Sequence, residues 1–323
     1  MGYEMIQGHL APALRSAPDL KSAGSGGGIL SIGDRVFPGR YGLHSRFEKA
    51  VNFTDGDRLV SIVNEEIGRG PVNIVFRGCR PPPAGPLLID EENVAVNGEV
   101  FRFDRQKIFN SSIDFKAADF TGLEKNLPVF EEALKDLSPA KSLAFLLDAV
   151  REKNFTAPSE KIFLKRVKGA VRIIFNDVVG SRHNVGGSIG TRCPSHRLQA
   201  NYIEGIKRLK GLGYGLTPAG DDFIAGLLVA FNLLEGVRGK SSAELKEKTR
   251  RAAQGNNLLV NSFLRLVEGG FYIETLQQLI LSLFGRNRRR IFDRTEGFLD
   301  RGETSGSDLA VGCFLALKSG LFS

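Results

Sequence analysis

The sequence predicts an α+β protein in which a small β sandwich or barrel is followed by a mainly α-helical domain. In the first third of the chain, short apolar segments alternate with turn residues, a spacing typical of small sheets. Further along, apolar residues recur with helical periodicity. The length of 323 residues exceeds what one hydrophobic core usually supports. We therefore expect an irregular lead-in at 1–28, a β domain at 29–118 and a helical domain at 119–323.

The β domain is predicted from apolar segments bounded by turn residues. The glycine run at 24–28 is assigned to the lead-in and not to a phosphate loop, because no strand precedes it and no Gly-Lys-Ser/Thr follows. Asn97-Gly98 supplies the positive φ angles of a type I′ turn and predicts a hairpin. We expect strands near residues 29–37, 50–53, 59–63, 72–76, 94–96 and 100–103.

The helical domain is predicted from stripes of apolar residues. Ser138-Pro139 has the chemistry of a helix start, since proline is tolerated in the first turn. Residues 171–196 begin with an apolar run and continue into a polar, glycine-rich stretch, so their structure stays ambiguous, with a long loop expected at the polar end. We expect helices at 123–137, 140–153, 159–168, 197–211, 218–235, 242–268, 271–284, 288–300 and 305–319.

Composition and charge indicate a cytoplasmic globular protein. Apolar residues make up 42% of the chain, and no apolar run is long enough to cross a bilayer. The N-terminal residues lack the features of a signal peptide. Three scattered cysteines (Cys79, Cys193 and Cys313) are consistent with reduced thiols.

The net charge of +8 suits an anionic metabolite, an acidic protein partner or nucleic acid. Five arginines cluster near the C-terminal end, and they are interpreted as a solvated helix face, an anion or partner contact, or a nucleic-acid contact. The absence of a recognisable nucleic-acid-binding motif argues against the last of these. The cluster contains Arg286, Arg288, Arg289, Arg290 and Arg294.

A repeated loop-to-helix motif is the main functional signal. The segments 215–226 (GLTPAGDDFIAG) and 302–312 (GETSGSDLAVG) both contain threonine followed by the pattern Gly-x-Asp-x-x-x-Gly. Each aspartate lies one helical turn before a glycine that allows another backbone to approach closely. We therefore expect the two helices to cross near Gly226 and Gly312, with Asp222, Asp308 and both helix N-termini converging on one cavity.

The start of the first motif helix has two interpretations. Thr217 followed by Pro218 fits an N-cap residue with proline at the first helical position, and Asp221 is the alternative cap. A purely structural explanation of both motifs also stays open, because aspartates at helix starts commonly cap and glycines inside helices commonly serve packing.

The expected cavity restricts its ligand. Helix N-termini favour phosphate or carboxylate groups. Carboxylates favour N–H donors or Mg²⁺. A ligand with both an anionic group and N–H donors would satisfy both ends of the cavity, and so would Mg²⁺ bridging Asp222, Asp308 and a phosphate. The sequence therefore leaves the metal requirement open.

The segment around GLTPAGDD resembles a bacterial family typified by AllH, a subunit of the oxamate carbamoyltransferase of allantoin breakdown. The resemblance also rests on His44-Ser45 near the AVNF segment at 50–53, on Gly70-Pro71, and on TSGSD at 304–308, and thus spans roughly residues 40–320. Ala219 departs from the usual serine of this loop, and residues 171–196 match nothing in the family pattern. Some members carry a carboxylase label.

The resemblance implies a cytoplasmic carbamoyltransferase subunit of purine breakdown that acts on oxamate or oxalurate and carbamoyl phosphate and works with other subunits. A non-catalytic metabolite-binding or scaffolding subunit is the alternative, because no nucleophile–base pair is legible. The expected catalytic residues are Asp221, Asp222, Asp308 and His44. The expected ligand-binding residues are Ser45, Gly215, Thr217, Gly220, Thr304, Ser305 and Gly306.

Two candidates carry less weight. His44 is a lone candidate for acid–base work or anion binding, and a histidine with a purely structural role is the alternative. His183, Cys193 and His196 lack a fourth ligand and match no usual zinc spacing.

Overall fold

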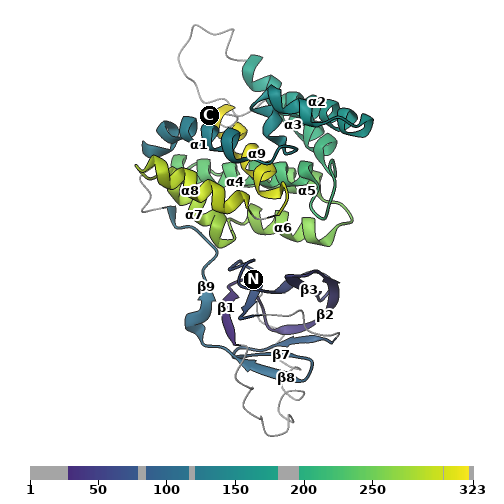
Figure 1. The fold of residues 1–323 in the computed structure, drawn as a ribbon, viewed down its shortest axis with the longest axis vertical. Helices are drawn as coiled ribbons and strands as arrows, with labels where there is room; N and C mark the ends of the chain where they lie inside the picture. Colours follow the sequence, from purple (N-terminus) through teal and green to yellow (C-terminus); the bar gives the residue numbers. More distant parts are fainter. Residues whose placement is uncertain (1–27, 79–84, 116–120, 181–195, 301, 320–323) are drawn as a thin grey trace. The chain divides into compact units, whose positions relative to one another are not determined.

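The computed structural model describes residues 28–78, 85–115, 121–180, 196–300 and 302–319. The chain divides into two compact units, Met1–Ser111 and Ser112–Ser323. Strands make up the first unit and helices the second, as Figure 1 shows. The α+β class predicted from the sequence is confirmed.

The first unit contains one curled sheet that forms a half-barrel. Its nine described strands are ordered β8-β7-β6-β2-β3-β4-β5-β1-β9. Neighbours pair antiparallel except at β4–β5 and β1–β9, which are parallel. The strands are β1 (Ile29–Gly33), β2 (Gly39–Arg46), β3 (Ala50–Thr54), β4 (Leu59–Val63), β5 (Asn73–Phe76), β6 (Leu87–Ile89), β7 (Asn93–Val96), β8 (Glu99–Arg102) and β9 (Ile108–Phe109).

Three strands of this sheet, β2, β6 and β9, were not predicted, and one predicted strand is shorter. β2 has a mostly exposed sequence without β-branched residues, so it carries little strand signal. β6 has only three residues and β9 only two, so neither makes a recognisable pattern. Val36 and Phe37 lie outside β1, because the chain turns directly after Gly33. The expected strand at 29–37 is therefore wrong over its second half.

The predicted hairpin turn at Asn97-Gly98 is confirmed. Asn97 has a φ of 54° and Gly98 a φ of 80°, and Val96 pairs with Glu99 across the β7–β8 ladder. A type I′ turn needs this left-handed backbone at both central positions, which asparagine and glycine adopt with least strain.

We expect Gly98→Ala to lower the free energy of unfolding of the first unit by about 1 kcal/mol. The cost comes from the backbone alone, since a methyl group at Gly98 would meet open space. Urea denaturation measures the change. Gly42→Ala is the matched control, because Gly42 lies in β2 without a positive φ and a methyl group there makes only ordinary contact. Equal stability of the two variants would contradict the expectation.

The second unit is a helical assembly built around α4 and α9. Both helices are buried almost all round, as their nearly uninterrupted apolar sequences require. The helices are α1 (Thr121–Leu137), α2 (Pro158–Gly180), α3 (His196–Leu209), α4 (Ala219–Arg238), α5 (Ala243–Ala253), α6 (Leu258–Glu268), α7 (Glu274–Leu283), α8 (Arg288–Leu299) and α9 (Ser305–Ser319), with 3₁₀ turns η3 (Leu143–Leu146) and η4 (Ala149–Asn154).

Three helix predictions need correction. The expected helix at 140–153 is two 3₁₀ turns, each capped by its own side chain, Ser142 and Asp148. α2 continues to Gly180, so the apolar start of the ambiguous 171–196 segment is helical, with Ile174 buried. The expected helix at 242–268 is broken after Ala253, because the Asn257 side chain caps a new helix by accepting from the N–H groups of Leu259 and Val260.

No helix in the described part of the chain is both long and apolar enough to cross a membrane.

Candidate functional site at the crossing of α4 and α9

The backbones of α4 and α9 touch at the two motif glycines. A Cβ atom added to Gly226 would lie 2.0 Å from the carbonyl oxygen of Leu309, and one added to Gly312 would lie 2.3 Å from that of Phe223. Only glycine permits this approach. The expected crossing of two helices, whose motifs are more than 80 residues apart in sequence, is confirmed.

The loops that open these helices also meet. The hydroxyl oxygens of Thr217 and Ser305 lie 3.2 Å apart and share a hydrogen bond. The motif loops 213–218 and 302–305 are therefore neighbours at the N-terminal ends of α4 and α9. Thr217 and Ser305 are half-buried, whereas Gly215 and Gly302 are exposed.

Neither expected cap of α4 is correct. The helix begins at Ala219, and Pro218 occupies the N-cap position without a side-chain hydrogen bond. Thr217 turns its hydroxyl to Ser305 and not to the helix backbone. The Asp221 carboxylate accepts instead from the backbone N–H of Gly211, at 3.0 Å. Both polar side chains thus fasten α4 to its surroundings.

Two of the expected ligand-binding glycines have packing roles. A Cβ atom at Gly220 would lie 2.0 Å from the carbonyl oxygen of Leu209, and the Gly220 N–H already donates to Leu212 at 2.8 Å. A Cβ atom at Gly306 would lie 2.7 Å from the carbonyl oxygen of Phe298. Gly215 is different, because its φ of 94° shapes an exposed turn with open space around it.

The aspartates of the two motifs lie buried beneath these loops. Asp222 is 1% exposed and Asp308 is fully buried. One Asp308 oxygen accepts from the backbone N–H of Leu143, at 2.6 Å. The other oxygen of Asp308 and both oxygens of Asp222 have no hydrogen-bond partner among the described residues. Three buried carboxylate oxygens without a partner are unusual, since such atoms normally find a donor.

Burial controls the protonation of this pair. Burial raises the pKa of Asp222 well above its usual range; the charges of Asp308 and Asp221 add to the rise, and the nearby hydroxyls of Ser305 and Thr217 reduce it without reaching hydrogen-bond geometry. Burial raises the pKa of Asp308 to about 7, although the Leu143 N–H and the Thr304 hydroxyl lower it.

Asp221 lies beside the pair and behaves differently. Burial raises its pKa as well, while the Gly211 N–H and the charge of Lys210 lower it. The Asp221 carboxylate accepts from the Gly211 N–H, and, unlike Asp222 and Asp308, Asp221 has no oxygen among the buried atoms that lack a partner in the described residues.

The remaining expected site residues lie apart from this crossing in sequence. His44 and Ser45 lie on β2 of the first unit, where the His44 Nδ1 atom and the Ser45 hydroxyl are 3.0 Å apart. Ser45 also accepts from Asn52, whose amide oxygen accepts from the buried Ser61 hydroxyl. This chain of hydrogen bonds orients Ser45 and leaves the His44 ring exposed.

The zinc candidates receive no support from the described residues. His183 and Cys193 lie outside these residues, as does the side chain of His196. Within the described part of the chain, no three histidine, cysteine or acidic residues are grouped so as to hold a metal ion. Cys313 is buried on α9, and burial raises the pKa of its thiol to about 12.

Sequence reasoning missed Leu143. Its N–H holds Asp308 across 165 positions of sequence, and a backbone donor in a 3₁₀ turn has no sequence signature. The one local signal for this turn in the sequence is Ser142, whose side chain caps it.

The geometry defines a protein with a β half-barrel unit and a helical unit whose centre holds two buried, partly unsatisfied carboxyl groups at a helix crossing. Residues 209–317, about a third of the chain, match the family model described as oxamate carbamoyltransferase subunit AllH. The matched segment contains both motifs and the helices α4–α8 complete, and the first unit lies outside it. No curated protein and no solved structure matches the chain.

Proposed function

We propose that this protein is a subunit of a carbamoyltransferase-type enzyme and binds a small carboxylate or acyl phosphate where the α4 and α9 loops meet. One observation carries the proposal: three carboxylate oxygens without partners lie beneath two touching loops, inside the segment that matches the AllH family model. Buried groups that lack partners and have strongly shifted pKa values are typical of functional sites.

The raised pKa values remove a conflict in the expected chemistry. An ionised carboxylate would repel an anionic ligand, whereas a protonated carboxyl group donates a hydrogen bond to it. Burial favours the protonated form of Asp222, and with a pKa of about 7 Asp308 exists in both forms near neutral pH. A ligand such as oxamate, with a carboxylate at one end and an amide at the other, suits this mixed pair.

Ligand access requires the loops to separate, since both carboxyl groups are sealed from solvent. The 213–218 loop suits such a movement. Gly213 and Gly215 have positive φ values, and Tyr214 and Leu216 carry exposed side chains. In the described part of the chain, two side-chain hydrogen bonds hold the loop to other elements: the Thr217 and Ser305 hydroxyls share one, and the Asn257 amide donates the other to the carbonyl of Leu216.

The proposed reaction moves a carbamoyl group from the phosphate oxygen of carbamoyl phosphate to the nitrogen of oxamate, which releases phosphate and forms oxalurate. The amide nitrogen loses a proton in this step, and the leaving phosphate carries the developing negative charge. We assign Asp308 to accept or return that proton and Asp222 to donate to the ligand, so that catalysis rests on positioning and charge stabilisation.

Mg²⁺ fits this site poorly as the loops stand. The carboxylate oxygens of Asp222 and Asp308 are ligands of the right kind, but Mg²⁺ usually retains several waters. Both carboxyl groups are sealed from solvent, so a hydrated ion could reach them only if the loops separate. No step of the proposed reaction is assigned to a metal.

A non-catalytic metabolite-binding or scaffolding subunit is the second candidate. It is favoured because no activated nucleophile lies beside Asp222 and Asp308 in the described residues. The thiol of Cys313 is buried and its pKa is raised, so it is not activated. We propose in addition what the family resemblance implies: that the protein works with partner subunits, in the cytoplasm, in allantoin breakdown.

We expect oxalurate to form when the native complex that contains this chain is given oxamate and carbamoyl phosphate, and Asp222→Asn to lower the rate by about a hundredfold. The assay measures oxalurate and released phosphate. Turnover by the chain alone would exclude the scaffolding role. A complex that forms no oxalurate, or that keeps its full rate with Asp222→Asn, would contradict the proposed function.

A further inference from the structure

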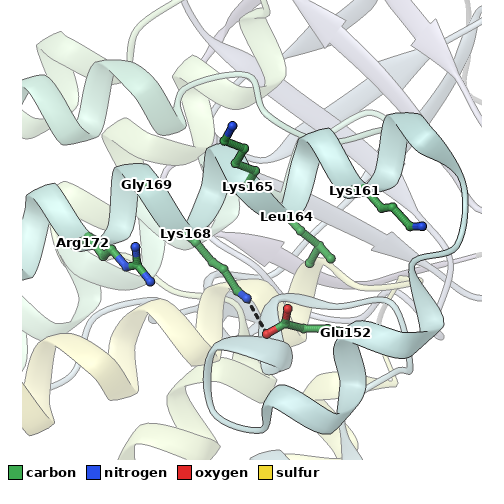
Figure 2. Close-up of a pocket in the computed structure, with 7 residues that line it drawn as sticks. All are labelled: Glu152, Lys161, Leu164, Lys165, Lys168, Gly169 and Arg172. Carbon is green, nitrogen blue, oxygen red and sulfur yellow. Dashed lines mark ion pairs between the residues drawn. The ribbon is translucent and has the colours of Figure 1, made fainter.

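A basic hollow lies along one face of α2, away from the motif residues. It has a volume of about 450 Å³ and is lined by four cationic side chains and one acidic one. Figure 2 shows the cationic side chains on successive turns of α2, with Glu152 facing Lys168 from η4. The lining residues are Glu152, Lys161, Leu164, Lys165, Lys168, Gly169 and Arg172.

The spacing of the cationic residues makes a continuous stripe. Lys161, Lys165, Lys168 and Arg172 follow one another at intervals of four, three and four positions, which places them on one helix face. With a rise of about 1.5 Å per residue, the stripe is roughly 16 Å long. Among the described residues, only Lys168 of these four has an ion-pair partner, Glu152 at 2.5 Å. The stripe thus retains an excess of positive charge.

Gly169 contributes open space to the hollow. Glycine in a helix interior is unfavourable, and close packing usually explains it. At Gly205, for example, a Cβ atom would lie 2.5 Å from the Ile174 side chain. At Gly169 nothing lies within 4 Å of that position. A methyl group at Gly169 would therefore meet open space, whereas a long side chain such as leucine would occupy part of the hollow.

We propose that this face of α2 binds an acidic segment of a partner protein, in an extended conformation. A stripe of this length matches roughly five residues of extended chain. The Glu152–Lys168 pair shows the geometry that an incoming carboxylate would adopt at the other cations. Arg172 also lines an adjoining hollow whose apolar walls include Leu146, Phe175 and Leu315. An apolar residue after the acidic ones would fit there.

The same features disfavour the other anionic partners. A free phosphate ion would contact one or two cations and leave most of the stripe unused. Among the residues that line the basic hollow none is aromatic, so a single-stranded nucleic acid would find no side chain there on which its bases could stack. The proposal concerns a surface distinct from the α4–α9 site and does not depend on the proposed function.

A labelled synthetic peptide of five glutamates followed by two leucines tests the proposal by fluorescence anisotropy with the full chain at low ionic strength. We expect saturable binding that Lys161→Glu with Lys165→Glu weakens by about tenfold or more. The matched control, Arg286→Glu with Arg289→Glu, makes the same charge change on exposed residues of the C-terminal arginine cluster and should leave affinity within about twofold.

Gly169→Leu separates shape from charge, because it fills the hollow without altering net charge. We expect it to weaken peptide binding while circular dichroism shows an unchanged helical content. Three results would overturn the proposal: no binding to the native chain, equal losses in the two charge-reversal variants, or tighter binding of a single-stranded oligonucleotide of equal charge through the same lysines.

Discussion

Gly226→Ala is expected to destabilise the helical unit by about 4 kcal/mol or more. The added methyl group would lie 2.0 Å from the Leu309 carbonyl oxygen and 2.6 Å from the Cys313 backbone nitrogen. Both neighbours are backbone atoms of a buried helix, so neither can move without separating α4 from α9. Urea denaturation followed by far-ultraviolet circular dichroism measures the loss, and Gly312→Ala should behave alike because its methyl group would meet Phe223.

Gly297→Ala is the control for this pair. Gly297 lies inside α8, and a methyl group there meets open space. Alanine should therefore stabilise the protein by up to about 1 kcal/mol through its better helix propensity. If Gly226→Ala were as stable as the control, the contact between the two backbones at the crossing would not exist, and the site described above would lose its scaffold.

Asp308→Asn is expected to be more stable than the native protein at pH 8, by an amount that shrinks as the pH falls. Burial raises the pKa of Asp308 to about 7 in the folded state, while its ordinary value is 3.8. The unfolded chain therefore releases this proton at lower pH than the folded chain does, and the native protein loses stability as pH rises between these values. Asparagine has no proton to release and still offers an oxygen to the Leu143 N–H.

The difference in unfolding free energy between Asp308→Asn and the native protein should grow by about 2–3 kcal/mol from pH 5 to pH 8. Urea titrations at both pH values measure it. Asp222→Asn should show the same direction, since burial also raises the pKa of Asp222. A difference that stays constant with pH would show that Asp308 titrates normally and is not held in the buried environment described.

The sequence predicted which segments of the second unit are helical better than it predicted where each helix begins and ends. Apolar stripes identified α4 and α9 because both are buried nearly all round, and the paired glycines predicted where they cross. The cap of α4 could not be predicted, because the hydroxyl of Thr217 and the carboxylate of Asp221 both found partners outside the helix, at Ser305 and Gly211. Such choices depend on tertiary contacts.

The sequence predicted the residues of the candidate site but not how deeply they are buried. The motif repeat identified Asp222 and Asp308 and predicted that they converge on one cavity, but it did not predict that both carboxyl groups are sealed from solvent. Burial depends on how every neighbouring element packs, including the 3₁₀ turn that supplies the Leu143 N–H. The sequence also predicted a cluster of arginines near the C-terminal end. Of these, Arg288 forms an ion pair with Glu132, and Arg294 donates a hydrogen bond to Gln278.

The central claim is tested most directly by the binding of oxamate to the purified chain at pH 7. Titration calorimetry measures the affinity, and the melting temperature of each variant is measured in parallel. We expect saturable binding by the native chain and at least about a tenfold loss of affinity in both Asp222→Asn and Asp308→Asn, with melting temperatures equal to or above that of the native chain. Unchanged affinity in both variants, or an absence of binding to the native chain, would contradict the claim that these buried carboxyl groups face a ligand.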